Sequence, residues 1–329
     1  MEGPERIDVH AHYYPESYFR DVVQGARGSR AILHDASGRG MIFGLTDPRS
    51  DPEARLADMD RLGIKAQVLS LANPNVYFEE EGKGRDLART TNNALSELSQ
   101  NHPGRFYFLA SLPFMSPKDA LHELERVSRL PGFVGVYMGT NILGEQIDHQ
   151  KFWPFFAELE RLDRPLFLHP IRPEGGERLK EFALEVIIGF PFETTLAASR
   201  LIFSGVLDRY PRLRVILAHF GGYLPYAVAR LRYGFTDYDE CRVNIRRSPE
   251  TYFDRFYADT AMAFHGPSLR CAVETLGKKR ILFGTDFPFG YTTRGVEITL
   301  ETLASLGLSP EELAGIESGN LRALLRLPK

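Results

Sequence analysis

The segment RVILAH, residues 214–219, sets four apolar residues in a row before a histidine. An uninterrupted apolar run of this kind is typical of a parallel strand that is buried on both faces, because a strand with one wet face would alternate. Similar short runs, bounded by Pro, Gly or Asp, recur along the chain. The eight predicted strands are Ile7–His12, Ala66–Leu71, Phe106–Leu112, Phe133–Met138, Pro165–His169, Arg214–His219, Phe256–Ala261 and Ile281–Asp286.

Helical patterns lie between these strands, so strand and helix alternate eight times. This order favours an α/β fold of the closed (β/α)₈ TIM-barrel type, and a doubly wound open sheet is the second interpretation. A break at Gly319 is expected in the last helix. The predicted helices are Pro52–Leu62, Arg85–Asn101, Lys118–Arg129, His149–Arg161, Phe192–Arg209, Leu224–Tyr233, Pro267–Leu276 and Pro310–Leu325.

The chain has 329 residues, which suits one barrel of roughly 250 residues with insertions, in a single domain over residues 1–329. One connection, Tyr13–Asp51, has 39 residues and is rich in Gly and Arg. Loops of that length are usually functional or disordered, so we interpret it as an insertion after strand 1 on the active-site face. A second insertion, Gly234–Thr251, is polar and carries three arginines.

The composition excludes several classes of protein. Apolar residues make up 43% and charged residues 25% of the chain, with a net charge of −3, so no excess of Lys and Arg points to a nucleic-acid partner. Only Cys241 and Cys271 occur, which argues against a disulfide scaffold and predicts a cytoplasmic protein. We find no signal-peptide pattern and no apolar run of about 18 residues, and therefore expect no membrane span.

The first predicted strand carries two histidines at alternate positions. In Ile7-Asp8-Val9-His10-Ala11-His12, side chains alternate between faces, so His10 and His12 share one face with Asp8 beneath them. In a barrel the polar set points inward. Two imidazoles at a strand's end can hold a metal ion, although a His-x-His pair by itself is also common on ordinary surfaces.

Two further histidines make a metal site the better interpretation. His169 follows the apolar run at residues 165–168, and His219 ends the segment quoted above. Barrel enzymes keep their catalytic groups at the carboxyl ends of the strands. A single histidine in such a place is more often a hydrogen-bonded core residue, but the same placement on strands 1, 5 and 6 indicates a shared site.

The eighth strand completes the set. Asp286 lies at the end of Ile281-Leu282-Phe283-Gly284-Thr285, and Gly284 leaves space on the same face. A buried carboxylate must be paired or bound to metal, because an unpaired buried charge is very costly. Three imidazoles and one carboxylate form a mixed nitrogen and oxygen set that suits Zn²⁺ first, and also Mn²⁺, Fe²⁺ or Co²⁺.

With these residues in place, the chain resembles the amidohydrolase superfamily, and within it the branch of aminocarboxymuconate-semialdehyde decarboxylase. The resemblance covers most of the chain. It implies that His10, His12, His169 and Asp286 bind one divalent metal ion, usually zinc, and that His219 is the catalytic acid/base, with Asp286 sharing that work. The motifs that carry it are Arg6–His12, Leu168–Pro170, Gly175–Arg178, Pro191–Thr194, His219–Gly222 and Gly284–Pro288.

Departures from the superfamily pattern refine this placement. Binuclear members carry a modified Lys on strand 4, but Phe133–Met138 has no Lys, so we expect one metal ion. Some related aromatic decarboxylases have Glu at the position of His10, which places this chain nearer the aminocarboxymuconate branch than the resorcylate branch. The family's Trp-Asp after the strand-5 His-Pro is replaced here by Ile171-Arg172.

Three arginines are candidates for binding the carboxylate of a small-molecule acid. Arg230 follows His219 by eleven residues, where the resemblance implies an Arg that reaches the neighbouring subunit of a homodimer; a surface Arg is the alternative. Arg49 is the nearest match to the family's substrate-binding Arg in the first insertion. Arg172 lies where Ile171-Arg172 replaces the family's Trp-Asp. Arg suits this task because its planar fork matches a carboxylate.

The predicted function is a metal-dependent non-oxidative decarboxylase, a carbon–carbon lyase, acting on an aromatic or muconate-type carboxylic acid. The alternative is a metal-dependent hydrolase or hydratase of the same superfamily that acts on an unsaturated or cyclic carboxylate. A barrel that binds metal without catalysis is a third interpretation, and the presence of His219 beside the four ligand candidates argues against it.

Overall fold

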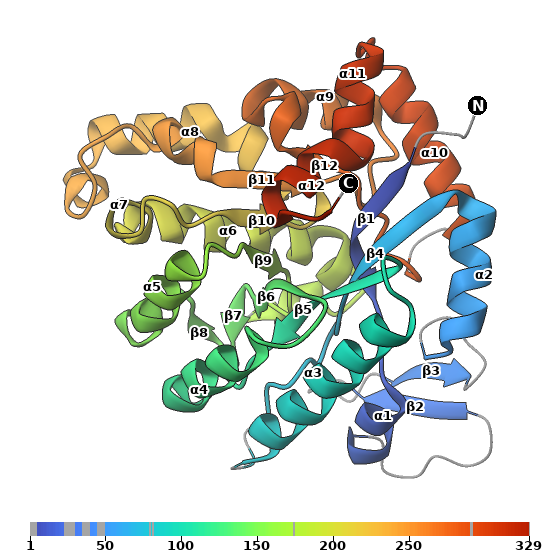
Figure 1. The fold of residues 1–329 in the computed structure, drawn as a ribbon. Helices are drawn as coiled ribbons and strands as arrows, with labels where there is room; N and C mark the ends of the chain where they lie inside the picture. The colour runs from blue at the N-terminus through green and yellow to red at the C-terminus, as the bar shows by residue number, and fades with distance from the viewer. Residues whose placement is uncertain are drawn as a thin grey trace.

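The computed structural model describes residues 5–22, 30–34, 40–44, 50–78, 80, 82–173, 175–289 and 292–328. Within these residues, eight parallel strands form one sheet, and helices surround it (Figure 1). The last strand returns to the first, since Val9 N–H donates to the Phe283 carbonyl at 2.9 Å and Asp286 N–H to the His10 carbonyl at 2.8 Å. The predicted barrel is confirmed, and the open-sheet alternative is wrong because both of its free edges are joined here.

The strands are shorter than the apolar runs at the carboxyl side of the barrel. The run at 214–219 forms a strand over three residues only, and the run at 281–286 over two. His219 and Asp286 therefore lie in irregular backbone beyond the strands and not within them. In the order of the sheet, the barrel strands are β1 (Arg6–His12), β4 (Ile64–Ser70), β5 (Phe106–Ser111), β6 (Phe133–Gly139), β9 (Leu166–His169), β10 (Val215–Leu217), β11 (Phe256–Asp259) and β12 (Ile281–Leu282).

Local sequence explains where the helices begin and end. At the start of α2 the Asp51 side chain accepts hydrogen bonds from two backbone N–H groups, Pro52 takes the first turn, and Gly63 ends the helix with φ +66°. The longer helices bury an apolar stripe against the barrel. The helices are α1 (Glu16–Val22), α2 (Pro52–Leu62), α3 (Lys83–Asn101), α4 (Pro117–Val127), α5 (Trp153–Arg161), α6 (Phe190–Phe203), α7 (Val206–Arg209), α8 (Leu224–Asp237), α9 (Gly266–Leu276), α10 (Thr292–Ala304), α11 (Pro310–Ala314) and α12 (Asn320–Leu325).

Several predicted helices differ from the observed ones. The predicted helix at 192–209 is split at Gly205, whose φ of +81° ends one helix and begins the next. It also begins earlier, in a π-helical turn, η3 (Glu185–Gly189). No break occurs at Gly319, because a second π-helical turn, η8 (Gly315–Gly319), joins α11 to α12. Helix α10 was not predicted.

The two predicted insertions contain regular structure. The first holds α1 and an antiparallel pair, β2 (Arg30–His34) and β3 (Gly40–Gly44). The second begins inside α8, which extends to Asp237, and continues into short 3₁₀ turns, η5 (Asp239–Arg242) and η6 (Pro249–Arg255). A small hairpin, β7 (Asn141–Ile142) and β8 (Glu145–Gln146), follows β6.

One helical stretch has the length and composition of a membrane span. Among the described residues, Glu185–Phe203 is a 19-residue helix whose mean hydropathy reaches 1.4, which we did not expect from the sequence. A core helix of a globular fold has the same properties. Its residues Ala197, Leu201 and Ile202 pack in the core around the barrel.

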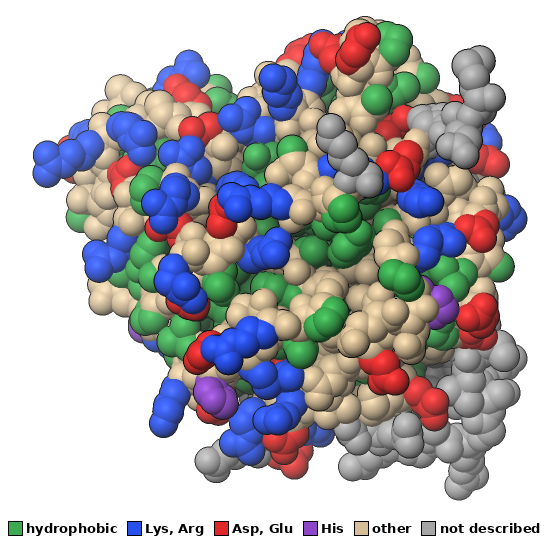
Figure 2. Space-filling view, viewed as in Figure 1, with side chains coloured by type: hydrophobic (Ala, Val, Ile, Leu, Met, Phe, Trp, Pro, Cys, Tyr) green, Lys and Arg blue, Asp and Glu red, His purple; other side chains and the backbone are tan. Residues whose placement is uncertain are grey.

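Across the face drawn in Figure 2, basic side chains are interspersed with acidic and apolar ones.

Candidate metal centre and active-site pocket

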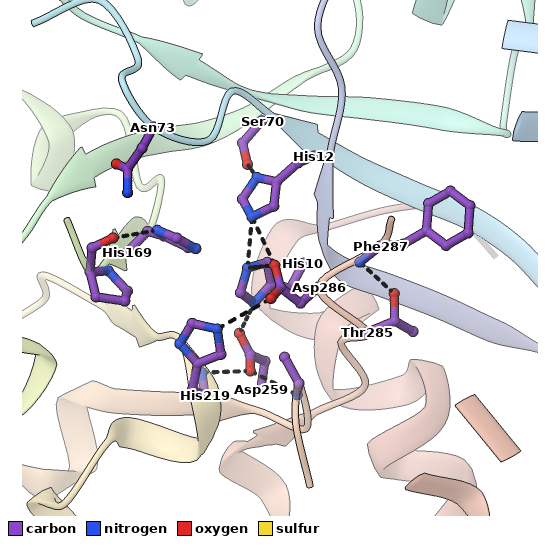
Figure 3. A network of polar contacts seen from close by, with 12 residues as sticks. His10, His12, Ser70, Asn73, His169, His219, Asp259, Thr285, Asp286 and Phe287 are labelled. Carbon is purple, nitrogen blue, oxygen red and sulfur yellow. Dashed lines mark hydrogen bonds and ion pairs between the residues drawn. The ribbon is translucent and has the colours of Figure 1, made fainter. Parts of the chain in front are cut away.

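Five ionisable side chains from four separate segments of the chain meet at the carboxyl end of the barrel (Figure 3). Strand β1 supplies His10 and His12, and the end of β9 supplies His169. His219 stands in the 3₁₀ turn η4 (His219–Gly221), directly after β10, and Asp286 lies four residues beyond β12. Parallel strands in a barrel end at one rim, which is why these side chains converge.

The backbone at two of these residues is held in the left-handed region. His219 has φ +54°, the following Phe220 has φ +44°, and Asp286 has φ +61°. Such conformations cost roughly 1–3 kcal/mol for residues other than Gly, and they persist only where the surrounding structure imposes them. At His219 and Asp286 this backbone conformation accompanies side chains whose ligand atoms meet at the centre of the rim.

The nitrogen and oxygen atoms at the centre are very close. His10 Nε2 lies 3.0 Å from His12 Nε2, and Asp286 Oδ1 lies 3.2 Å and 3.1 Å from these two nitrogens. His219 Nε2 faces the other carboxylate oxygen of Asp286 at 3.6 Å. Ligand atoms around a tetrahedral zinc ion, with bonds of about 2.1 Å, stand roughly 3.4 Å apart, so the spacing suits a bound cation.

Hydrogen bonds at the outer nitrogens fix which ring nitrogen points inward. His10 Nδ1 donates to Asp259 Oδ2 at 2.8 Å, and His169 Nδ1 donates to the Pro170 carbonyl at 2.8 Å. A carbonyl can only accept, so the proton of neutral His169 sits on Nδ1 and its Nε2 lone pair faces the centre. That Nε2 atom is buried and has no hydrogen-bond partner among the described residues. A buried unpartnered lone pair aimed at a cluster of ligand atoms fits a metal ion.

Two ligand sets can be drawn from the five residues. The ligand atoms of His10, His169, His219 and Asp286 all lie within 4.8 Å of one another, whereas the sequence analysis predicted His12 in place of His219. His12 is nonetheless in direct contact with His10 and Asp286, as given above. The side chain of His219 is 11% exposed, and that of His12 is 1% exposed. The greater access of His219 suits a group that exchanges a proton with a substrate.

Charges within the site shift its protonation. Burial alone would lower the pKa of His10, but the carboxylates of Asp259 and Asp286 raise that pKa to about 10 when no cation is bound. Burial lowers the pKa of His12 and holds the pKa of His169 well below its usual value. Burial would raise the pKa of Asp286, but the neighbouring histidines hold it well below its usual value. His10 thus stands between the carboxylates of Asp259 and Asp286, where a divalent ion can take the place of its proton on the inner nitrogen.

A buried polar network supports the centre from below. Asp8 accepts from Thr285 Oγ1 at 2.7 Å and from Gln67 Nε2 at 3.0 Å. Gln67 in turn accepts from Arg55 Nη1 at 2.8 Å, and Arg55 Nη2 donates to the His12 carbonyl. Arg55 is fully buried, and its guanidinium lies over the Phe287 ring at 4.9 Å. The network ties β1, α2 and the segment after β12 together directly beneath the histidines.

Two features of the site were not predicted from the sequence: the role of Asp259 and the burial of Arg55. Asp259 ends β11 as an ionisable residue after three apolar or aromatic ones, which is the same signal that pointed to His169 and His219. Arg55 gave no such signal, because an Arg on an amphipathic helix normally faces solvent. The expectation for Gly284 is confirmed, since a Cβ there would lie 2.8 Å from Asp259 Cβ and 3.0 Å from His10 Cβ.

A cavity of about 1590 Å³ opens above the centre, and His12, His169, His219 and Asp286 line its floor. Its walls are largely apolar, with aromatic side chains from the segments around η3, η4 and α8. A cavity of this kind, with few polar groups at one end, is typical of a small-molecule site. Lining side chains include Tyr77, Phe190, Phe220, Tyr226, Met262 and Phe289.

The three arginines predicted to bind the substrate differ in their position relative to the cavity. Arg172 lines the cavity, with its Nε 3.4 Å from Glu185 Oε1. Arg230 lies exposed on α8, its guanidinium 5.7 Å from the Tyr233 ring, and is not among the residues around the cavity. Arg49 lies outside the described residues.

The chain is similar to a family of known enzymes along almost its whole length. Residues 7–327 match the sequence profile of a family described as amidohydrolase. The 2-amino-3-carboxymuconate-6-semialdehyde decarboxylase of Dictyostelium discoideum is 31% identical over 294 residues, which cover 86% of this chain and 82% of that protein. The gamma-resorcylate decarboxylase of a Polaromonas species is 30% identical over 295 residues, covering 84% of this chain and 87% of that protein.

A solved structure is similar over the full length. The dihydroxybenzoic acid decarboxylase of a Polaromonas species, determined with bound manganese and the inhibitor 2-nitroresorcinol, superposes with a TM-score of 0.82. The two sequences are 28% identical, and the match covers 100% of this chain and 98% of the other. The chain therefore resembles this decarboxylase in fold, in length and in sequence.

Proposed function

The chain belongs to the amidohydrolase family, and from this premise we propose that it is a metal-dependent non-oxidative decarboxylase, a carbon–carbon lyase, acting on an aromatic or muconate-type carboxylic acid. The observation that carries the proposal is the convergence of four histidines and Asp286, of which all but the buried His10 line the floor of a large, mainly apolar cavity. The named relatives are decarboxylases of such acids. The proposal treats the chain as one catalytic domain.

In this proposal one divalent ion is bound per chain by His10, His12, His169 and Asp286. Nitrogen ligands with one carboxylate suit Zn²⁺ first, and Mn²⁺, Fe²⁺ or Co²⁺ also fit the set; the similar Polaromonas structure holds manganese. A bound divalent ion would polarise an oxygen of the substrate acid or lower the pKa of a bound water. Metal content after loading with each of these ions would rank them.

The residues of the chain supply the proton chemistry. In the proposed reaction the carbon–carbon bond to the carboxylate breaks, CO₂ leaves, and the electron pair stays on the substrate carbon, which takes a proton. His219 delivers that proton from Nε2, the atom that faces Asp286 Oδ2 and is reached from the cavity. Asp286 Oδ2, 3.6 Å from that nitrogen, orients the ring toward the cavity. The largely apolar cavity walls lower the local dielectric constant, which strengthens the attraction between opposite charges at the site.

The substrate acid needs a cation besides the metal, and Arg172 is the proposed candidate because it lines the cavity. Its contact with Glu185 holds the guanidinium at the wall. If Arg172 binds the acid, Arg172→Met should raise KM by at least tenfold with a smaller change in kcat, because the interaction is made before the reaction. An unchanged KM would remove Arg172 from substrate binding. Arg49 stays a candidate by sequence only.

The decisive experiment is a screen of the metal-loaded protein against aromatic and muconate-type acids, with CO₂ release as the measurement. His219→Ala is the matched control: it should keep its metal and lose about 10²–10⁴-fold in turnover, the usual contribution of a positioned acid/base. Turnover without CO₂ would instead indicate a hydrolase or hydratase. Loss of metal in His219→Ala would assign His219 to the ligand set.

We also propose a cytoplasmic homodimer in which Arg230 reaches the partner's site. Arg230 is exposed on α8, the same helix exposes Tyr226 (84% accessible), and the cavity-lining Ile187 of η3 is 59% accessible. Exposed apolar groups of this kind commonly mark an interface, and a two-fold dimer would exchange the same patch in both directions. The described free cysteines, Cys241 and Cys271, suit a reducing compartment.

Subunit mixing tests the dimer. Arg230→Ala and His219→Ala are each expected to be inactive. When they are mixed with subunit exchange, one site of each mixed dimer carries both native residues, so activity should partly return. A monomer at micromolar concentration, or no recovery despite proven exchange, would leave Arg230 as an ordinary surface residue.

A further inference from the structure

Asp259 is a buried carboxylate to which the proposed function assigns no task. It lies at the end of β11, is fully buried, and belongs to neither ligand set. Its two oxygens contact two different parts of the site. Oδ2 accepts from His10 Nδ1 at 2.8 Å, and Oδ1 accepts from the backbone N–H of His219 at 2.9 Å (Figure 3).

The contact with His10 fixes a tautomer. A carboxylate can only accept, so the Nδ1 proton of His10 is held on the outer side of the ring. The Nε2 lone pair then faces His12 and Asp286, where a metal ion would take it. A carboxylate behind a ligand histidine is known to orient the ring and to raise its basicity.

The contact with His219 fixes a backbone. His219 and Phe220 both have positive φ, a conformation that L residues rarely adopt without support. Asp259 Oδ1 accepts from His219 N and, at 3.0 Å, from Ala261 N, so it ties the turn after β10 to the end of β11. This bond sets where the imidazole of His219 emerges into the cavity.

The fold makes room for this carboxylate. A Cβ on Gly284 would lie 2.8 Å from Asp259 Cβ, so only Gly allows the segment after β12 to approach so closely. The neighbouring Thr260 bonds the backbone of Gly284 in both directions, at 3.0 Å and 3.1 Å. Position, burial and hydrogen bonding of Asp259 are thus all determined by the barrel.

We propose that Asp259 is a positioning residue that holds His10 in the metal-binding tautomer and His219 in its functional backbone conformation, so that one carboxylate aligns the metal centre and the acid/base together. The inference rests on the proposed metal site. It does not depend on which acid is the substrate.

Asp259→Asn provides a sharp test because the side chain keeps its shape and cannot satisfy both sets of donors. If the amide oxygen faces the backbone N–H groups, its NH₂ faces His10 Nδ1 and forces the ring proton onto Nε2. If the amide flips, its NH₂ faces two backbone donors. We expect the dissociation constant for Zn²⁺, measured by competition with a chromophoric chelator, to rise about 10–100-fold. In the metal-saturated variant, kcat should also fall, because the His219 turn is loosened in the second arrangement.

Glu123→Gln is the matched control. Glu123 is also a buried carboxylate, but its partners, Asn92 on α3 and Arg126 on α4, lie on the outer helices and not among the residues of the metal centre. Its replacement therefore reports the stability cost of removing a buried charge. The control should keep the wild-type affinity for Zn²⁺. If Asp259→Asn also keeps that affinity within twofold, the proposal is overturned.

A measurement on the wild-type protein covers the case in which the variant does not fold. Nitrogen-15 NMR of the zinc-loaded protein should show a proton on His10 Nδ1 that exchanges slowly with water. An unprotonated Nδ1 would overturn the inference. A wild-type protein that takes up no divalent ion would instead overturn the proposed function, so the two failures are distinguishable.

Discussion

Gly284→Ala adds a single methyl group at the closest approach of three segments of the site. Its Cβ would lie 2.8 Å from Asp259 Cβ and 3.0 Å from His10 Cβ, whereas carbon atoms in comfortable contact are about 3.5–4.0 Å apart. Roughly 0.7 Å must therefore be gained by moving Asp259, His10 or the backbone after β12. None of the three is the flexible end of a long side chain.

The magnitude follows from two opposing effects. Overpacking in a well-packed interior costs about 1–3 kcal/mol, and replacing Gly by Ala returns about 0.4–1 kcal/mol through the unfolded chain. We expect a net loss of about 1–2 kcal/mol in the free energy of unfolding. We also expect Zn²⁺ binding to weaken about tenfold, because the methyl group presses on a proposed ligand and on the carboxylate behind it.

Urea denaturation and chelator competition measure these two quantities separately. Gly266→Ala serves as the control, since a Cβ there meets only Ser305 Oγ at 3.6 Å, an ordinary contact. If Gly284→Ala matches Gly266→Ala in both stability and metal affinity, the argument that close packing at Gly284 sets the geometry of the site is wrong.

Three further predictions concern the same rim and its support. His12→Ala should lower metal content well below one equivalent by elemental analysis, while His265→Ala on the exposed start of α9 should not; full occupancy in His12→Ala would contradict the ligand assignment. Arg55→Met should lower the free energy of unfolding, measured by urea denaturation, by about 3 kcal/mol, because Gln67 Oε1 and the His12 carbonyl lose the buried guanidinium that donates to them. A loss under about 1 kcal/mol would contradict a supporting role for Arg55. Burial raises the pKa of Tyr13 to about 12, so the stability that its neutral form contributes is complete below pH 10 and is lost as the pH rises through 12. Between pH 10 and 11 the free energy of unfolding of Tyr13→Phe should therefore fall by about 1 kcal/mol less than that of the wild type. Equal losses in the two proteins would show that Tyr13 ionises freely in the folded state.

The amino-acid sequence by itself determined the order of the eight barrel strands, most of the helices between them, and most of the rim residues. Apolar runs such as the one before His219 predict strands buried on both faces, and eight of them alternating with helices predict a barrel. Because all strands of a parallel barrel end at one rim, a residue's place at the end of its own strand was enough to bring His10, His169 and Asp286 together. The pattern within each short segment was therefore enough to predict which residues meet at the rim.

The tertiary structure alone decided how those groups are aimed. The hydrogen bond of His10 to Asp259 joins residues 249 positions apart, and no local sequence pattern predicts that these two side chains pair. The positive φ of His219 and the full burial of Arg55 likewise arise only when the barrel closes. The physical reason is that periodicity and apolar runs report which face of an element is buried, whereas ring tautomers, ion-pair partners and backbone strain depend on atoms that other elements bring within about 3 Å.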